Sequence, residues 1–113
     1  MSTWTHVCGA IRIDDIRQIS GGTLAKALAH WQTLVPEGSE GELNVTGWEN
    51  PSVNSLASYT ITVHGDLRDY DTPQEIVDWL NGRCTVPAAI RNGCVQIEVE
   101  GRDPVIWQYK RHD

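Results

Sequence analysis

The chain has 113 residues, 40% of them hydrophobic, and fifteen acidic against nine basic side chains give it a formal net charge of −6. Its length predicts a single domain over residues 1–113 that folds without disulfides or a metal, and its apolar share excludes a disordered chain. The acidic balance repels phosphate backbones at long range, so we expect no binding of long nucleic acid, whereas a small nucleotide in a local pocket remains compatible.

The cysteines and the N-terminal residues indicate the cellular compartment in which the protein is expected. Cys8, Cys84 and Cys94 are odd in number and form no CxxC pair, which is typical of a reducing environment. The first five residues contain neither a basic stretch nor an apolar run, and no apolar stretch of the sequence is long enough to cross a bilayer. We therefore expect a cytoplasmic protein without a membrane partner.

The N-terminal half predicts two strands around one helix. Residues alternate between apolar and polar over Trp4–Ile13, which indicates a first strand. Apolar side chains then recur every three or four residues over Thr23–Leu34, which indicates an amphipathic helix that Pro36 stops. A short second strand is expected over Leu43–Trp48.

The next two elements have the clearest signals in the chain. Tyr59–His64 alternates strictly and is expected to end at Gly65. Thr72, Pro73 and Glu75 have the spacing of an N-cap, a first-turn proline and a capping box, so a second helix is expected to begin there and to close at Gly82.

Two more strands are expected over Cys94–Glu100 and Val105–Lys110. The resulting order, β-α-β-β-α-β-β, predicts an α+β fold. Right-handed crossovers and short connections favour a ferredoxin-like β-α-β-β-α-β antiparallel sheet with two helices on one face and an extra C-terminal edge strand.

In this arrangement the helices cover one face of the sheet, and polar residues gather on the other. Rings there could stack on a planar ligand while Arg12 clamps a phosphate. A solvated face or a dimer interface would show the same pattern. The residues of this face are His6, Cys8, Arg12, Thr60, Thr62 and His64, flanked by Asn44, Thr46, Trp48, Gln96 and Glu98.

The segment from Gly65 to Asp71 is the most concentrated charged region. Arg68 could bind an anion there, with Asp66 and Asp69 orienting it or accepting ribose hydroxyls. Alternatively, the two acids stabilise the start of the following helix and pair with Arg68.

Two glycine-bearing loops could hold phosphate through backbone N–H groups. They are Ser20-Gly21-Gly22 and Gly38-Ser39-Glu40-Gly41, and neither matches a Walker or dinucleotide fingerprint. Ser20-Gly21-Gly22 is also an ordinary way to begin a helix.

Metal binding and catalysis have little support in the sequence. His6, Cys8 and His64 could converge on one face, but they lack zinc-site spacing, and we expect neither metal nor cofactor. A Cys8 nucleophile with His64 as base is geometrically conceivable, yet no residue at a recognisable spacing orients the base. We therefore expect no catalytic residues and a protein that is not an enzyme.

Three segments resemble a group of small, uncharacterised bacteriophage proteins. They are W-T-H-V-C-G-A-I-R-I-D at Trp4–Asp14, G-S-E-G at Gly38–Gly41 and G-D-L-R-D-Y at Gly65–Tyr70. The resemblance implies a phage origin. Small phage proteins without catalytic signatures often act on host defence by binding a molecule, so it also implies a binding protein in the host cytoplasm.

These expectations combine into one prediction. The chain is a non-catalytic, homo-oligomeric binding protein that sequesters a nucleotide second messenger of cyclic or ADP-ribose type. The alternatives are an inhibitor that binds a host protein through an exposed surface and a small nucleotide-processing enzyme. The predicted ligand-binding residues are Arg12, Ser39, Trp48, Thr60, Thr62, His64, Arg68 and Asp69.

Overall fold

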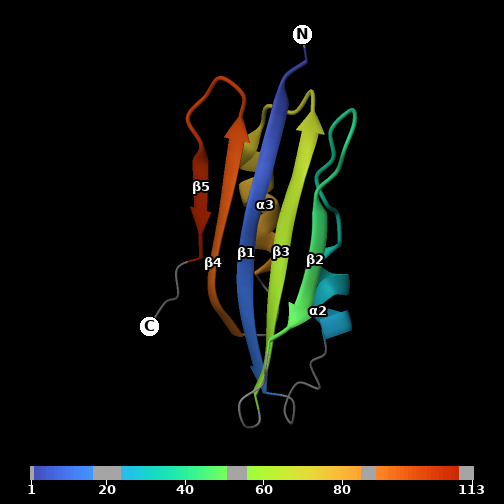
Figure 1. Cartoon of the computed structure of the whole chain (residues 1–113), viewed down its shortest axis with the longest axis vertical. Coiled ribbons are helices and arrows are strands. Elements are labelled where there is room, and N and C mark those ends of the chain that lie inside the picture. The colour runs from blue at the N-terminus through green and yellow to red at the C-terminus, as the bar shows by residue number, and fades with distance from the viewer. Residues whose placement is uncertain (1, 17–23, 51–55, 85–88, 110–113) are drawn as a thin grey trace.

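The computed structural model describes residues 2–16, 24–50, 56–84 and 89–109. These residues form an α+β fold with one open antiparallel sheet and two helices (Figure 1). In chain order the elements are β1 (Trp4–Ile16), α2 (Leu24–Trp31), β2 (Asn44–Glu49), β3 (Leu56–Arg68), α3 (Pro73–Arg83), β4 (Ala89–Val99) and β5 (Val105–Gln108).

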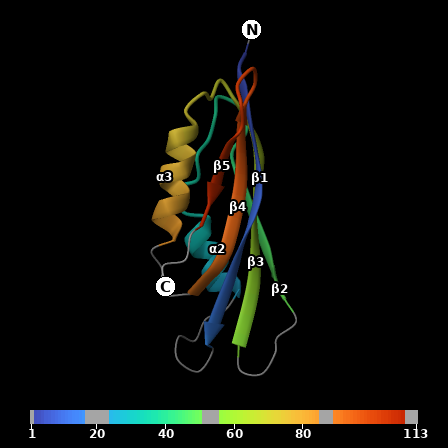
Figure 2. The same ribbon diagram turned by 90° about the vertical axis from the view of Figure 1, so that its left-hand side faces the viewer.

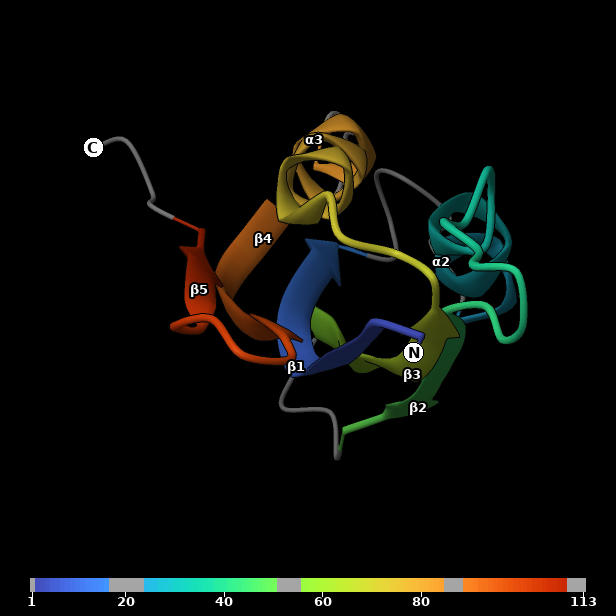
Figure 3. The ribbon, with the colours of Figure 1, turned by 90° about the horizontal axis from the view of Figure 1, so that it is seen from above.

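The sheet has the strand order β2-β3-β1-β4-β5, so β1 lies in the middle and β2 and β5 form the edges. Both helices lie against the same face of this sheet, with α2 over β2 and α3 over β4 (Figures 2 and 3). No helix in the described ranges has the length and apolarity needed to span a membrane.

The central strands are longer than the sequence pattern predicts. β1 pairs with β3 from Trp4 opposite Arg68 to Ile16 opposite Leu56. The expectation that Gly65 ends its strand is wrong, because Gly65 pairs with Val7 and the strand continues. This glycine serves close packing instead, since a Cβ there would lie 2.9 Å from the Glu42 carbonyl oxygen.

The two helices also differ from their expected ends. α2 stops at Trp31, and Leu34 has a left-handed φ of 55°, so the helix does not extend to Leu34. α3 does begin after Thr72 with Pro73 in its first turn, but the Thr72 side chain makes no cap hydrogen bond. The prediction of a capping box at the start of α3 is therefore wrong.

The Glu75 carboxylate instead accepts a hydrogen bond of 3.0 Å from the Tyr70 hydroxyl. Burial and this bond raise the pKa of Tyr70 to about 12. At its other end α3 continues through Gly82 to Arg83, and the Cys84 N–H caps it by donating to the carbonyls of Leu80 and Asn81.

The core lies between the helices and the covered face of the sheet. Its strand residues are the alternate positions, represented by Ile11, Ile61 and Ile97, all of them fully buried. Trp31 from α2 meets Trp79 from α3 edge to face, with ring centroids 6.1 Å apart. The two helices thus contact each other through these indoles as well as contacting the sheet.

Trp31 is fully buried, so truncating it should leave a large cavity. We expect Trp31→Ala to lower the free energy of unfolding by about 3–5 kcal/mol in urea titrations followed by circular dichroism. The control is Leu34→Ala, whose side chain is 81% exposed and whose loss should change stability by less than about 0.5 kcal/mol. Equal effects of the two substitutions would contradict the described core.

Candidate functional site

The face of the sheet that points away from the helices, termed the open face, carries the polar alternate residues of every strand. On β1 the exposed residues of this face are His6, Cys8, Ala10 and Arg12, whereas their neighbours Val7, Ile11 and Ile13 are buried beneath the helices. Arg12, Thr60 and His64 therefore lie on one side of the sheet, as the alternation predicts.

Strand pairing arranges the middle of the open face in four rows that cross the sheet. The rows are Trp48, Thr60, Arg12 and Asn92 (the Arg12 row); Thr46, Thr62, Ala10, Cys94 and Gln108 (the Ala10 row); Asn44, His64, Cys8, Gln96 and Ile106 (the Cys8 row); and Asp66, His6 and Glu98 (the His6 row).

Arg12 belongs to a small charged cluster at one end of the open face. Its Nε donates to Asp14 Oδ1 at 3.2 Å, and the Arg91 Nε donates to Asp14 Oδ2 at 3.3 Å. The Asp14 side chain is only 13% exposed, whereas the two arginines are 51% and 53% exposed. One shielded carboxylate thus orients two accessible guanidinium groups.

Arg91 reaches this cluster because of an irregularity in the sheet. The pairing of β1 with β4 shifts between Arg12 and Ile13, so Arg12 lies opposite Asn92 and Ile13 opposite Ile90. Arg91 has no partner of its own in this register, as is usual for a bulged residue. No sequence pattern marked this residue, because a bulge arises only when two strands meet.

The same row presents groups that suit a planar ligand. Trp48 is 52% exposed and comes from the edge strand β2. Thr60 lies between it and Arg12 and donates to the Asn50 side-chain oxygen at 2.9 Å.

The opposite end of the open face is acidic. His6 Nδ1 lies 2.6 Å from Asp66 Oδ1, and His6 Nε2 lies 3.9 Å from Glu100 Oε2. The hydrogen bond to Asp66 is the main cause that raises the pKa of His6, and the charges of Asp66, Glu100 and Glu98 add to it against a smaller effect of burial.

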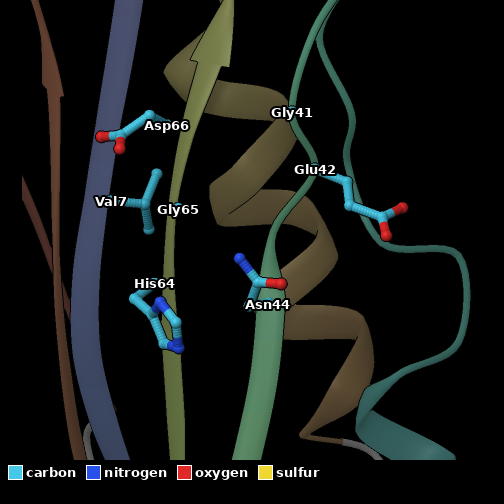
Figure 4. A pocket seen from close by; sticks show the side chains of 7 residues that line it. All are labelled: Val7, Gly41, Glu42, Asn44, His64, Gly65 and Asp66. Carbon is cyan, nitrogen blue, oxygen red and sulfur yellow. The ribbon is translucent and has the colours of Figure 1, made fainter.

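Beside the acidic end lies a shallow, open depression of about 590 Å³. Figure 4 shows Asn44, His64 and Asp66 projecting into it from β2 and β3, with Glu42 at its margin. Thr46 and Thr62, one row further along, share a hydroxyl hydrogen bond of 2.6 Å.

Three of the predicted ligand-binding residues lie together elsewhere. Ser39 donates to Asp69 Oδ2 at 2.8 Å, and Arg68 Nη1 donates to Glu40 Oε1 at 2.6 Å. The alternative in which Arg68 pairs with Asp66 or Asp69 is therefore wrong, because Glu40 is its partner.

Arg68 lies eight positions after Thr60, the partner of Arg12, and eight steps of about 3.3 Å along a strand span about 26 Å. The two arginines therefore cannot hold the same small phosphate. The eight predicted residues divide into five on the open face and three beside the end of β3.

The Gly38–Gly41 loop uses backbone groups that an anion would need. The Gly38 N–H donates to the Gly41 carbonyl, and the Ser39 N–H donates to the Arg68 carbonyl, each at 2.9 Å. Gly41 has a φ of 77°, and a Cβ there would collide with the Asp66 carbonyl. The glycines thus allow this loop to pack against β3. The other glycine loop, Ser20-Gly21-Gly22, lies outside the described residues.

Cys8 and His64 are direct cross-strand neighbours, with Asn44 beyond His64. A nucleophile–base pair needs a third group that orients the imidazole. Within the described part of the chain, no residue makes a hydrogen bond to the His64 ring, and no three His, Cys, Asp or Glu side chains group so as to hold a metal ion.

No protein-family model matches the sequence, and no curated protein matches it. Among solved structures, aminopeptidase PepT from Bacillus cereus has a TM-score of 0.50 at 13% identity over 87% of this chain and 29% of that chain. A tripeptidase from Staphylococcus aureus has a TM-score of 0.49 at 12% identity over 86% of this chain and 29% of that chain.

A phage SAM lyase in complex with S-methyl-5'-thioadenosine has a TM-score of 0.37 at 8% identity, over 96% of this chain and 93% of that chain. The likeness to PepT shows a shared fold alone, and this chain spans 29% of that enzyme's length. The two likenesses with TM-scores below 0.5 support no conclusion.

The raised pKa of His6 gives a titration test. Its carboxylate neighbours stabilise the protonated ring, so their stabilising effect is complete below the ordinary pKa of 6.5 and disappears as the pH rises through the raised pKa. In NMR titrations of the imidazole we expect a midpoint above 6.5, and Asp66→Asn should lower it. Glu40→Gln, which alters the Arg68 pair instead, is the control, and an unchanged midpoint in Asp66→Asn would refute the assignment.

The three thiols should differ in reactivity. Burial raises the pKa of Cys84 to about 11, whereas Cys8 and Cys94 are exposed on the open face. With an aromatic disulfide reagent at pH 8, Cys8 and Cys94 should therefore react first, and Cys84 only slowly until the protein is denatured. Single cysteine-to-serine variants assign the phases, and rapid labelling of Cys84 would contradict its described surroundings.

Proposed function

We propose that this chain is a small, phage-type, non-catalytic binding protein that sequesters a nucleotide of the second-messenger class on its open face. The observation that carries the proposal is the Arg12 row, in which an exposed indole, a hydroxyl and a guanidinium lie in register on three adjacent strands. Such a protein would counteract host defence by lowering the free concentration of the messenger.

The spacing of the row suits this ligand class. Two inter-strand distances separate Trp48 from Arg12, or about 10 Å. A base stacked on Trp48 would extend its sugar across Thr60 and bring its phosphate to Arg12 and Arg91. Base stacking and charge-assisted hydrogen bonds to guanidinium are the strong interactions available to such a ligand.

The open face also favours binding over turnover. The His64 imidazole beside Cys8 has no hydrogen-bond partner among the described residues. The Arg12 row, by contrast, contains an ordered pair of arginines held by Asp14. Sequestration of a nucleotide needs only such positioned binding groups and no nucleophile or base.

The arrangement of elements supports a proposed ferredoxin-like classification. The strand order β2-β3-β1-β4 and the two helices on one face accord with a β-α-β-β-α-β unit, to which β5 adds an edge strand. We propose the host cytoplasm as the place of action, and the three free cysteines favour a reducing compartment.

Exposed apolar side chains favour one alternative, an inhibitor that binds a host protein. Trp48, Val105 and Ile106 are all exposed, at the two edge strands of the sheet. Aromatic and apolar anchors of this kind often carry the energy of protein interfaces. A stoichiometric complex with one host protein, lost in Ile106→Asp but kept in Arg12→Ala, would favour this function over nucleotide binding.

The nucleotide proposal is tested by calorimetry with cyclic dinucleotides, cyclic ADP-ribose and mononucleotides. We expect saturable binding of one class, weakened by Trp48→Ala about 5- to 150-fold, as loss of a stacking interaction of about 1–3 kcal/mol implies. Arg12→Ala should weaken binding and reduce its dependence on salt. The control is Arg102→Ala, an exposed arginine that bonds to the Asp71 carbonyl.

No binding across the panel would refute the proposal. The bound nucleotide should be recovered unchanged by mass spectrometry after long incubation, and its conversion would support a nucleotide-processing enzyme instead.

A further inference from the structure

The open face carries charges of opposite sign at its two ends. At one end the guanidinium groups of Arg12 and Arg91 share the single carboxylate of Asp14. At the other end His6 is surrounded by the carboxylates of Asp66, Glu98 and Glu100. The first end therefore has a net positive charge and the second a net negative charge, although the chain as a whole is acidic.

Two rows without carboxylate or guanidinium groups lie between these ends, the Ala10 row and the Cys8 row. The Ala10 row has short side chains at Thr46, Thr62, Ala10 and Cys94, where the two threonine hydroxyls already bond to each other, and it ends at Gln108 on β5. The four short side chains would let a second sheet approach to the usual face-to-face spacing of about 10 Å.

Such a surface is complementary to itself in one orientation only. A two-fold axis that lies in the face and crosses the strands along the Ala10 row reverses the strands, so that the part of β4 that carries Arg91 in one copy faces the part that carries Glu98 in the other, twice. An axis parallel to the strands would instead pair like charges, which is unfavourable at a close interface.

We propose that the open face is an interface between two copies of this chain, packed face to face with their strands antiparallel about an axis along the Ala10 row. β4 of one copy then faces β4 of the other. Arg91 precedes Cys94 in the Ala10 row by three residues, and Glu98 follows it by four. Each Arg91 is thereby brought close to the partner's Glu98.

The available area is adequate for a stable dimer. β1 has thirteen residues, or about 43 Å at 3.3 Å per residue, and four inter-strand spacings add a width of about 19 Å. The product, at most about 800 Å² per copy, matches a standard interface. Trp48 and Ile106, at 52% and 51% exposure, lie on opposite edges of this area and would be partly covered.

This inference goes beyond the nucleotide proposal and stands without it. If both hold, the partner's carboxylates and a ligand phosphate compete for the same two arginines, so a nucleotide that binds there should dissociate the dimer. The dimer itself is tested without nucleotide, so that either proposal can fail alone.

A charge exchange tests the interface by analytical ultracentrifugation. We expect the unmodified protein to sediment as a dimer that weakens with added salt, and Arg91→Glu and Glu98→Lys each to raise the dimer dissociation constant about tenfold or more, because each creates two like-charge contacts. An equimolar mixture of the two variants should regain the dimer, since every contact then joins opposite charges. The chain carrying both substitutions should regain it as well.

Recovery in the mixture excludes misfolding as the cause of the loss. A monomeric unmodified protein, or a mixture that stays monomeric although both variants are folded by circular dichroism, would overturn the proposal. A dimer that neither substitution weakens would also overturn it and would point to pairing through the edges β2 or β5.

A cross-link gives a second, independent reading. Cys94 lies on the proposed axis and is exposed, so it should face its own copy in the partner. A short bis-maleimide should therefore join two chains in the unmodified protein and in Cys8→Ser, but not in Cys94→Ser. Equal cross-linking of all three would contradict the face-to-face arrangement.

Discussion

The structure depends on the position of β1 between β3 and β4. β1 pairs with a strand on both sides over most of its length. The alternation of its side chains between the two faces therefore sets which residues of the neighbouring strands share each face of the sheet. A slip of one residue in either pairing would move Ile11 to the solvent and Arg12 into the core. The burial of Ile11 and Ile61 beneath the helices therefore fixes where every polar residue of the open face lies.

The two helices cover the apolar face of the sheet and so keep its residues buried. Trp31 and Trp79 fill the space above the sheet, and each places its indole among buried apolar groups. The Trp79 Nε1–H donates to the Thr33 carbonyl at 2.9 Å, which ties α3 to the segment that follows α2. With one face sealed in this way, the other is free to carry charges and rings that the core does not require.

The open face combines two electrostatic environments on one rigid support. Asp14 holds two arginines at one end, and Asp66 holds His6 at the other. Because strands fix these groups more firmly than loops would, their separation along the face is a property of the fold. The proposed nucleotide would occupy only one of these ends, whereas the proposed second copy would cover both.

By itself, the sequence determined the face on which the residues of its clearly alternating segments lie. The alternation of Thr60, Ile61 and Thr62, for example, reports local geometry that any strand obeys. It also located both helices, from their apolar spacing and from Thr72 and Pro73. Tertiary structure alone decided which side chains meet across distant segments.

Arg68 bonds to Glu40, Glu75 to Tyr70, and Arg91 reaches Asp14 through a bulge, and no pattern along the chain marked these pairs. Strand register sets such contacts, and register is a collective result of packing the core. The sequence therefore predicted which residues lie on the open face, whereas only the folded sheet showed that their charges gather at its two ends.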